Sequence, residues 1–301
     1  MAIDHYGEIG SNQRITNHPL SLKNFGSAMA INFDVLVQTP EHSIDMKSGL
    51  ETFQGASETT RYIAETVLTG RTSQRHSHKN KVRTVLKQSF KGSYGQMFSL
   101  EIYDDELQKK FARIGRATFA ELMEYFIHEA LYLETKENSD KANKIIESLG
   151  EDEAEKLVEQ LRSSPLNLIH GISKKFNLTV QLRYRKNREI QKSLATLNTS
   201  TAQKLEAVRS EQKVDLTACI TRLNIYTGNG RLQVKGEHET TAFGFGITYR
   251  EVRIEAKRIF SDNLNKNNGT PEDKMEYIRI SAYPVKLQND RVVKYIIAGF
   301  Y

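Results

Sequence analysis

The stretch that decides the fold is residues 220–243, ITRLNIYTGNGRLQVKGEHETTAF. It has the pattern of a strand, a tight turn through Gly228 and Gly230, a second strand and a third. The glycines have a physical role, because a tight turn into a twisted strand needs a positive φ or a close approach of two backbones. The pattern therefore predicts the opening strands of a small β-barrel.

The rest of the C-terminal part continues this pattern. From residue 214 onward the chain is dominated by strand-like runs, among them residues 251–259. A polar loop is expected at residues 262–273, which are rich in asparagine and end near a proline. We therefore predict that residues 213–301 form a barrel-like β domain.

The N-terminal part has a different pattern, typical of a small unit of mixed helix and strand. Residues 28–39 alternate between apolar and polar side chains, as a half-buried strand does. A helix is expected from Asp45, a residue suited to a helix N-cap, to Gly70, a suitable stop. Residues 82–90 and 96–103 alternate on either side of a glycine-containing turn and predict a hairpin. These elements together predict a β-α-β-β unit.

The middle of the chain is predicted to be mainly helical. Residues 104–134 indicate one long helix, with acidic residues in its first turn and an apolar stripe along it. A short strand is expected at residues 178–184, and further helices at residues 139–149, 151–161, 186–197 and 201–212. The whole chain is thus predicted to be an α+β protein with a flexible arm at residues 1–27, an α+β domain with a helical middle at 28–212, and the barrel-like domain.

Composition indicates a protein of a reducing compartment. Cys219 is the only cysteine among 301 residues, which excludes an intramolecular disulfide and a thiolate metal cluster, and we expect it to be a small buried hydrophobe. The N-terminus lacks the pattern of a secretory signal, and no window approaches the apolar length of a membrane span. A cytoplasmic protein without a membrane partner is therefore expected.

Charge is distributed unevenly along the chain, although the net charge is only +6. Residues 66–100 contain no acid, and residues 162–192 carry eight basic residues against Glu189 alone. Between them, in residues 101–161, acids outnumber Lys and Arg by 16 to 8. Such segregation predicts surfaces of opposite charge, of which the basic ones would suit a polyanion or an acidic partner. The alternative is that the charged runs only form solvent-exposed faces.

Basic residues in three parts of the chain are candidates for binding phosphates. On a strand, Arg183 and Arg185 would share one face, with Tyr184 on the other. The alternative is an exposed strand edge that cations protect against aggregation. The candidate nucleic-acid-binding residues are Arg71, Arg75, Lys79, Lys81, Arg83, Arg183, Arg185, Lys186, Arg188, Arg222 and Arg231.

The spacing N-x-x-x-G-x-G-x-L that begins at Asn224 is similar to the first hairpin of cold-shock domains, which are small OB-fold barrels. The resemblance implies an OB- or SH3-like barrel, and it covers only this hairpin and the strand after it. Cold-shock domains stack bases on aromatic side chains of these strands. Here the matching positions hold Arg222, Asn229 and Arg231, so any nucleic-acid role must depend on charge. The alternative is a barrel that only docks a partner.

Over its whole length the chain resembles a family of bacterial proteins of unassigned activity that recur beside mobile-element and phage-defence genes. The resemblance is carried by residues 48–55, by the hairpin segment Gly92-Ser93-Tyr94 and by residues 227–232. It implies a role in phage–host conflict, either in defence or in anti-defence.

A scan for catalytic motifs finds no phosphate loop, dinucleotide fingerprint or nucleophile elbow. His128 and Glu129 begin like a zinc-protease helix, but Tyr132 stands where the second histidine is needed. His76 and His78 are interpreted as loop histidines rather than metal ligands. No cofactor and no metal are therefore expected.

Glu255 and Lys257 are weak catalytic candidates. On a strand they would form the E-x-K half of a metal-dependent nuclease site. The second acid would have to come from Asp215, Glu237 or Glu239. A solvated strand face is the favoured interpretation.

The hypothesis that follows is a non-enzymatic bacterial or phage protein that acts in phage–host conflict. It would bind nucleic acid, or a partner that carries a nucleotide, through its basic surfaces. One alternative is a protein-interaction, oligomerisation or inhibitor subunit, either as a homo-oligomer or within a complex. The other alternative is a metal-dependent nuclease.

Overall fold

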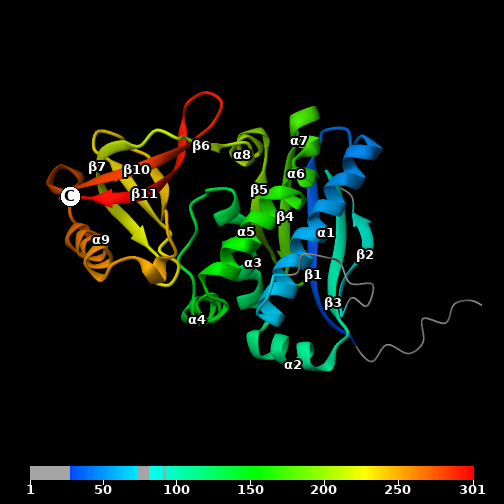
Figure 1. The fold of residues 1–301 in the computed structure, drawn as a ribbon. Coiled ribbons are helices and arrows are strands. Elements are labelled where there is room, and N and C mark those ends of the chain that lie inside the picture. Colours follow the sequence, from blue (N-terminus) through cyan, green and yellow to red (C-terminus); the bar gives the residue numbers. More distant parts are fainter. Residues whose placement is uncertain (1–27, 73–80, 91–92) are drawn as a thin grey trace, which may run out of the picture.

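The chain folds into two lobes, each built on its own β-sheet (Figure 1). The computed structural model describes residues 28–72, 81–90 and 93–301. The N-terminal lobe contains β1 (Met29–Gln38), β2 (Val82–Phe90), β3 (Tyr94–Ile102), β4 (Thr179–Arg185) and β5 (Gln191–Leu197). These strands form one antiparallel sheet in the order β2-β3-β1-β4-β5.

Helices cover one face of this sheet (Figure 1). On β1 the side chains of Ile31, Phe33 and Val35 point into this layer and are buried. The predicted first helix is α1 (Met46–Thr69), which begins where the Asp45 carboxylate accepts a hydrogen bond from the Ser48 N–H at 2.8 Å. The β-α-β-β unit, made of β1, α1, β2 and β3, is confirmed.

The helical middle is also confirmed, and it completes the layer over the sheet. It consists of α2 (Asp105–Ile114), α3 (Arg116–Ala130), α4 (Asp140–Leu149), α5 (Glu151–Ser163), α6 (Pro165–Ile169) and α7 (Gly171–Phe176). The prediction of one long helix at residues 104–134 is wrong, because Gly115 has a φ of 81° and interrupts it. The break brings Phe111 and Phe119 edge to face, with ring centroids 5.4 Å apart.

The helix predicted at residues 186–197 is wrong as well, because β5 occupies its second half. The Asn187 side chain accepts hydrogen bonds from the N–H groups of Glu189 and Ile190, at 2.9 and 2.7 Å, and so forms the turn of a hairpin. Edge pairing with β4 then determines the conformation of a segment that is mostly polar. The helix predicted at 201–212 is shortened to α8 (Thr199–Leu205), and the chain extends from there into β6 (Val208–Arg209).

The C-terminal lobe is a closed barrel, as predicted. It contains β7 (Val214–Leu223), β8 (Gly230–Val234), β9 (Thr240–Phe245), β10 (Ile278–Lys286) and β11 (Val292–Phe300). The pairs β7–β8, β8–β9, β10–β11 and β7–β10 are antiparallel, whereas β9 and β11 are parallel. This connectivity is that of an OB-fold, a five-stranded Greek-key barrel.

The opening hairpin of the barrel has the expected local chemistry. The Asn224 side chain accepts hydrogen bonds from the N–H groups of Tyr226 and Thr227, at 2.9 and 3.2 Å. Gly228 has a φ of 68°, which L side chains rarely adopt. At Gly230 a Cβ would lie 2.2 Å from the Arg222 carbonyl oxygen, so only glycine fits there.

The strand predicted at residues 251–259 is wrong, because the short 3₁₀ turn η1 (Tyr249–Glu251) leads into helix α9 (Ile254–Asn267). The predicted polar loop at 262–273 begins inside this helix and includes the 3₁₀ turn η2 (Glu272–Lys274). Phe260 closes one end of the barrel, with its ring centroid 5.5 Å from that of Phe243. Asn263 is buried too, and its side-chain oxygen accepts from the Ile220 N–H at 2.7 Å. The segment was predicted to be a loop because it is rich in asparagine, but in the structure buried asparagines of this helix form hydrogen bonds with neighbouring backbone.

Two compositional expectations have direct structural counterparts. Cys219 is fully buried on β7, where its Sγ lies 3.7 Å from the Met275 Sδ. In the part of the chain that the structure describes, every helix is too short or too polar to cross a lipid bilayer.

Candidate functional site

Most of the basic residues predicted to bind nucleic acid lie in two separate regions of the structure. Arg75 and Lys79 lie outside the described residues. Arg71 is exposed just after α1, and the Lys81 Nζ lies 2.6 Å from an Asp104 carboxylate oxygen. The remaining candidates lie either on the open face of the N-terminal sheet or in the joint between the two lobes.

The face of the N-terminal sheet that points away from the helices carries Arg83 on β2 and Arg183 and Arg185 on β4. The register explains this placement, since Phe33 of the buried face pairs with Tyr184, and the next residue, Asp34, pairs with Arg183. Side chains alternate between the two faces of a strand, so Asp34 and both arginines share the open face. The predicted alternation of Arg183 and Arg185 around Tyr184 thus corresponds to the two faces of this sheet.

Asp34 is a fully buried carboxylate that holds both arginines. Its two oxygens accept from the Arg183 Nε at 2.6 Å and from the Arg185 Nη1 at 2.7 Å. One negative charge thereby orients two guanidinium groups, and the cluster keeps an excess of positive charge.

Phe90 lies across this cluster from the far side of the sheet. Its ring centroid is 5.8 Å from the Arg183 Cζ and 5.4 Å from the Arg185 Cζ. Gly95 on β3 makes room for the ring, because a Cβ at that position would lie 2.2 Å from it. The result is an aromatic ring in contact with two guanidinium groups on the open face of the sheet.

A second polar cluster lies beside it, on β3. Burial disfavours the charge on Glu101, but hydrogen bonds from Lys87, Tyr103 and Ser99 outweigh this effect and lower its pKa to about 2. The Arg83 Cζ lies 5.4 Å from the ring centroid of Tyr103. Glu101 is therefore a carboxylate that holds basic and aromatic side chains in place on the open face.

The hairpin between β4 and β5 extends the face with exposed cations. Lys186 and Arg188 are both exposed there, next to Glu189. The Arg188 carbonyl oxygen accepts from the Arg185 Nη2 at 3.2 Å, which ties the hairpin to the arginine cluster. The open face and this hairpin, which we call the sheet-face site, contain the basic residues Arg83, Lys87, Arg183, Arg185, Lys186 and Arg188 and the acidic residues Asp34, Glu101 and Glu189.

Arg222 and Arg231 are not on this surface. They point from the barrel into the joint between the lobes, where Arg222 Nη1 donates to the Thr135 carbonyl oxygen and its Nη2 to the Lys136 carbonyl oxygen at 3.0 Å. In OB-folds the second and third strands and the flanking loops form the ligand face. Here residues of these strands, β8 and β9, line the joint with the helical lobe. Arg222, on the neighbouring strand β7, forms hydrogen bonds across the joint.

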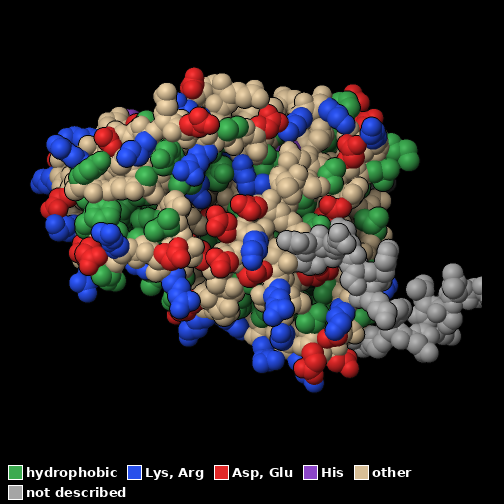
Figure 2. Space-filling model, viewed as in Figure 1, with side chains coloured by type: hydrophobic (Ala, Val, Ile, Leu, Met, Phe, Trp, Pro, Cys, Tyr) green, Lys and Arg blue, Asp and Glu red, His purple; other side chains and the backbone are tan. Residues whose placement is uncertain are grey.

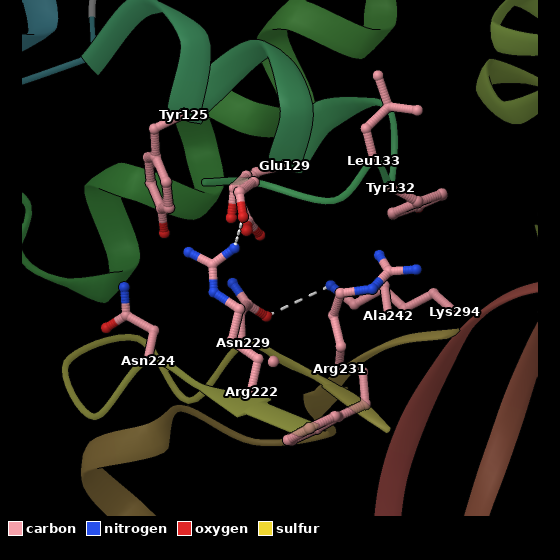
Figure 3. Close-up of a pocket in the computed structure, with 13 residues that line it drawn as sticks. Tyr125, Glu129, Tyr132, Leu133, Arg222, Asn224, Asn229, Arg231, Ala242 and Lys294 are labelled. Carbon is pink, nitrogen blue, oxygen red and sulfur yellow. Dashed lines mark hydrogen bonds between the residues drawn. The ribbon is translucent and has the colours of Figure 1, made fainter. Parts of the chain in front are cut away.

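A narrow pocket lies in this joint (Figure 3). Its free volume of ≈ 20 Å³ suffices for one water-sized group. Charged and aromatic side chains of both lobes line it, namely Tyr125, Glu129 and Tyr132 from the helical lobe and Arg222, Arg231 and Lys294 from the barrel. We call it the joint pocket.

The ionisable groups of the joint pocket are only loosely paired. Burial raises the pKa of the Glu129 carboxyl and lowers the pKa of the Lys294 ammonium, because both charged forms lose water. The nearest hydrogen bond of the Lys294 Nζ, at 3.5 Å, is to the Asn229 side-chain oxygen. Arg231 donates from Nε to the Thr240 hydroxyl at 2.7 Å, whereas its buried Nη1 has no hydrogen-bond partner.

Tyr132 is held in an unusual conformation beside these groups. It has a φ of 52°, which is rare for a residue other than glycine. Two cations lie near its ring, with the Arg162 Cζ at 4.4 Å and the Lys294 Nζ at 5.7 Å from the ring centroid. Strained backbone of this kind is concentrated at functional sites.

The joint pocket opens toward a cleft of ≈ 530 Å³ between the lobes. The two share Tyr125, Glu129, Tyr132, Asn229 and Lys294. Glutamates of α5 line the far side of the cleft, and on the face drawn in Figure 2 acidic and basic side chains are intermingled along the joint. The joint is therefore not a basic patch of the kind that attracts a long polyanion.

The structure changes the setting of the two weak catalytic candidates. Glu255 is exposed in the first turn of α9, not on a strand, while the Lys257 Nζ lies 4.7 Å from the ring centroid of Tyr249. Of the possible second acids, Asp215 and Glu237 are exposed, and Glu239 bonds to Arg291 at 2.7 Å. Across residues 28–72, 81–90 and 93–301, no three His, Cys, Asp or Glu side chains are grouped to hold a metal.

His128 is tied to backbone carbonyl groups. Its ring nitrogens lie 2.8 Å from the Glu134 carbonyl oxygen and 3.1 Å from the Leu194 carbonyl oxygen. These contacts fasten α3 to the following loop and to β5, which is a structural role.

Sequence reasoning did not identify several residues of the sheet-face site and the joint pocket. Asp34 had a visible signal, because a carboxylate stands in the middle of an apolar alternating strand. Phe90, Tyr132 and Lys294 had none, since each meets its partners only through contacts between distant segments.

Comparison of the chain with protein-family models, with curated proteins and with solved structures found no match. The two sites are therefore interpreted from their geometry and chemistry.

Proposed function

We propose that the protein binds single-stranded nucleic acid on the sheet-face site. The observation that supports this most is the arrangement of Arg183, Arg185 and Phe90, in which two guanidinium groups contact an aromatic ring on a sheet face that the described helices leave open. Sheet surfaces of this type bind extended strands because bases stack on aromatic rings while cations contact the phosphates.

The charge of the site favours a polyanion. Six basic side chains face three carboxylates, and two of the carboxylates, Asp34 and Glu101, are used to orient cations. Lys186 and Arg188 extend this positive charge to the end of the sheet. A nucleic-acid strand that crosses Phe90 would continue past them. A role in binding rather than catalysis agrees with the lack of a catalytic motif in the sequence. The setting in phage–host conflict is proposed from the sequence resemblance alone.

The proposal is tested by fluorescence anisotropy with labelled single-stranded DNA and RNA over a series of salt concentrations. The variant Lys186→Gln/Arg188→Gln should weaken binding and reduce the slope of log K against log[salt] by about 1.4, since each phosphate contact on a single strand contributes about 0.7. Both side chains are exposed, so the fold should be unaffected. The matched control is Lys141→Gln/Lys144→Gln on α4, where both lysines are exposed on the helical side.

A second variant tests the aromatic ring. Phe90→Leu keeps an apolar contact over Gly95 but removes stacking, and it should cost about 1–3 kcal/mol of binding free energy without changing the salt slope. Phe176→Leu, at a ring exposed on α7, is its control. Equal affinity of wild type and both test variants would refute the sheet-face site. Binding of an acidic protein but of no oligonucleotide at low salt would favour the protein-interaction alternative instead.

A further inference from the structure

The joint pocket has the features of a site built for an anionic group. Three cations, Arg222, Arg231 and Lys294, line it against one carboxylate, Glu129. Arg222 is engaged with backbone carbonyl oxygens, but the buried Nη1 of Arg231 has no partner, and the Lys294 Nζ has only a long contact. A buried donor without an acceptor is costly, so an acceptor supplied by a ligand would remove that cost.

The surrounding backbone keeps these donors accessible. Gly244 on β9 leaves room here, because a Cβ would lie 2.7 Å from the Asn229 side-chain oxygen and 3.3 Å from the Lys294 Nζ, and both side chains would have to shift. Tyr132, with its positive φ, covers the pocket from the helical lobe. Figure 3 shows Arg222 directed toward Glu129, Arg231 toward Tyr132 and Lys294 toward Asn229. A ligand at these cations would therefore touch both lobes at once.

The size of the space limits the ligand. The pocket has room for one oxygen of an anion, whereas the adjoining cleft of ≈ 530 Å³ has the volume of a site for a small molecule. Glu155 and Glu159 of α5 line that cleft. Carboxylates only accept hydrogen bonds, so they match a ligand body that carries hydroxyl groups.

We propose that the joint pocket and its cleft bind a small phosphomonoester with hydroxyl groups, the phosphate at Lys294 and Arg231 and the hydroxyls at Glu155 and Glu159. A nucleoside monophosphate and a sugar phosphate share this chemistry. The site lies on the other side of the helical layer from the sheet-face site, and it does not depend on the proposed function. Because the ligand would bridge the lobes, it should stabilise the molecule as a whole.

Thermal unfolding and calorimetry, at constant ionic strength, test this with adenosine monophosphate, ribose 5-phosphate, inorganic phosphate and adenosine. Either phosphomonoester should raise the melting temperature by several degrees at ~100 times its Kd, whereas adenosine should not. Ribose 5-phosphate that binds no more tightly than inorganic phosphate would overturn the assignment of hydroxyls to the glutamates. Adenosine that binds as tightly as its monophosphate would overturn the assignment of the phosphate.

Two variants locate the site. Lys294→Met keeps an aliphatic chain over Tyr132 and should lower affinity at least ~10-fold, the range for a lost charge-assisted hydrogen bond. Glu129→Gln should raise affinity, because it removes the carboxylate that lines the joint pocket itself, next to the proposed phosphate position. The control is Lys235→Met, whose ammonium lies 5.5 Å from the ring centroid of Tyr277 elsewhere on the barrel. The proposal is overturned if wild type binds no phosphomonoester, or if Lys235→Met loses as much affinity as Lys294→Met. Oligonucleotide binding that is unchanged in Lys294→Met would show that this site is separate from the sheet-face site.

Discussion

At the scale of single residues, some buried polar side chains have a hydrogen-bond partner for each polar atom. His170 is a clear case, because it is completely buried between α6 and α7. Its ring nitrogens lie 2.6 Å from the Leu166 carbonyl oxygen and 2.8 Å from the Thr201 hydroxyl. The neutral ring satisfies both contacts by donating to the carbonyl oxygen and accepting from the hydroxyl.

This arrangement predicts a pH dependence of stability. Burial lowers the pKa of His170 from 6.5 to about 4, so the unfolded chain binds a proton at a higher pH than the native one. Stability is thus lost as the pH falls through the window from 6.5 to about 4, and the loss at pH 4.5 should be about 2–3 kcal/mol. Urea unfolding at pH 7.5 and 4.5 measures it.

The variant His170→Asn isolates this contribution. It cannot titrate in the window, so the difference between wild type and variant should shrink as the pH falls from 7.5 to 4.5. A difference that is independent of pH would show that folding does not shift the pKa of His170.

At the scale of elements, the close packing of α1 on α6 decides how the helical layer sits on the sheet. Gly55 allows it, because a Cβ there would lie 2.5 Å from the Pro165 carbonyl oxygen and 2.7 Å from the Ile169 N. Gly49, six residues earlier on α1, would meet only the end of the Ile44 side chain, which can move aside. Both glycines are costly for a helix by itself, yet only one of them is required by packing.

The two glycines therefore predict opposite effects. Gly55→Ala should destabilise the protein by about 1–3 kcal/mol despite the better helix propensity of alanine, since backbone atoms have to shift. Gly49→Ala should leave stability unchanged or raise it by up to about 1 kcal/mol. Free energies of unfolding in urea give both values, and a stabilising Gly55→Ala would contradict the described packing.

At the scale of the whole molecule, the two lobes have separate apolar cores and meet through polar contacts. Arg222 joins β7 to the loop after α3. On the other side of the joint, a carboxylate oxygen of Glu151 accepts from the Tyr249 N–H at 2.5 Å. Hydrogen bonds to charged groups contribute about 1.5–3 kcal/mol each, so these contacts matter for the coupling of the lobes.

Removing both contacts should uncouple the lobes without unfolding either. We expect the variant Arg222→Gln/Glu151→Gln to melt in two calorimetric transitions, one for each core, where wild type melts in one. Arg253→Gln, at an exposed side chain on the barrel lobe, is the control. A single transition at the wild-type temperature in the double variant would mean that other contacts hold the joint.

The sequence by itself determined the parts of this protein that depend on local chemistry. Asn224, Gly228 and Gly230 specify the barrel hairpin, and Asp45 specifies the start of α1, because caps and turns depend on only a few neighbouring residues. The strand face of Arg183 and Arg185 was predictable for the same reason, since alternation along a strand is local.

Only the tertiary structure decided which segments meet. Residues 191–197, of which four of seven are polar, form a strand because they pair with the edge of β4. Asn263 of α9 is buried because its side chain accepts a hydrogen bond from the barrel backbone at Ile220. The placing of Phe90 over two arginines, and of Tyr132 beside Lys294, depends on contacts between segments far apart in the chain. Such contacts leave no periodic pattern in a single sequence. The basic residues could therefore be recognised from the sequence, but their division between the open face of the N-terminal sheet and the joint between the lobes could not.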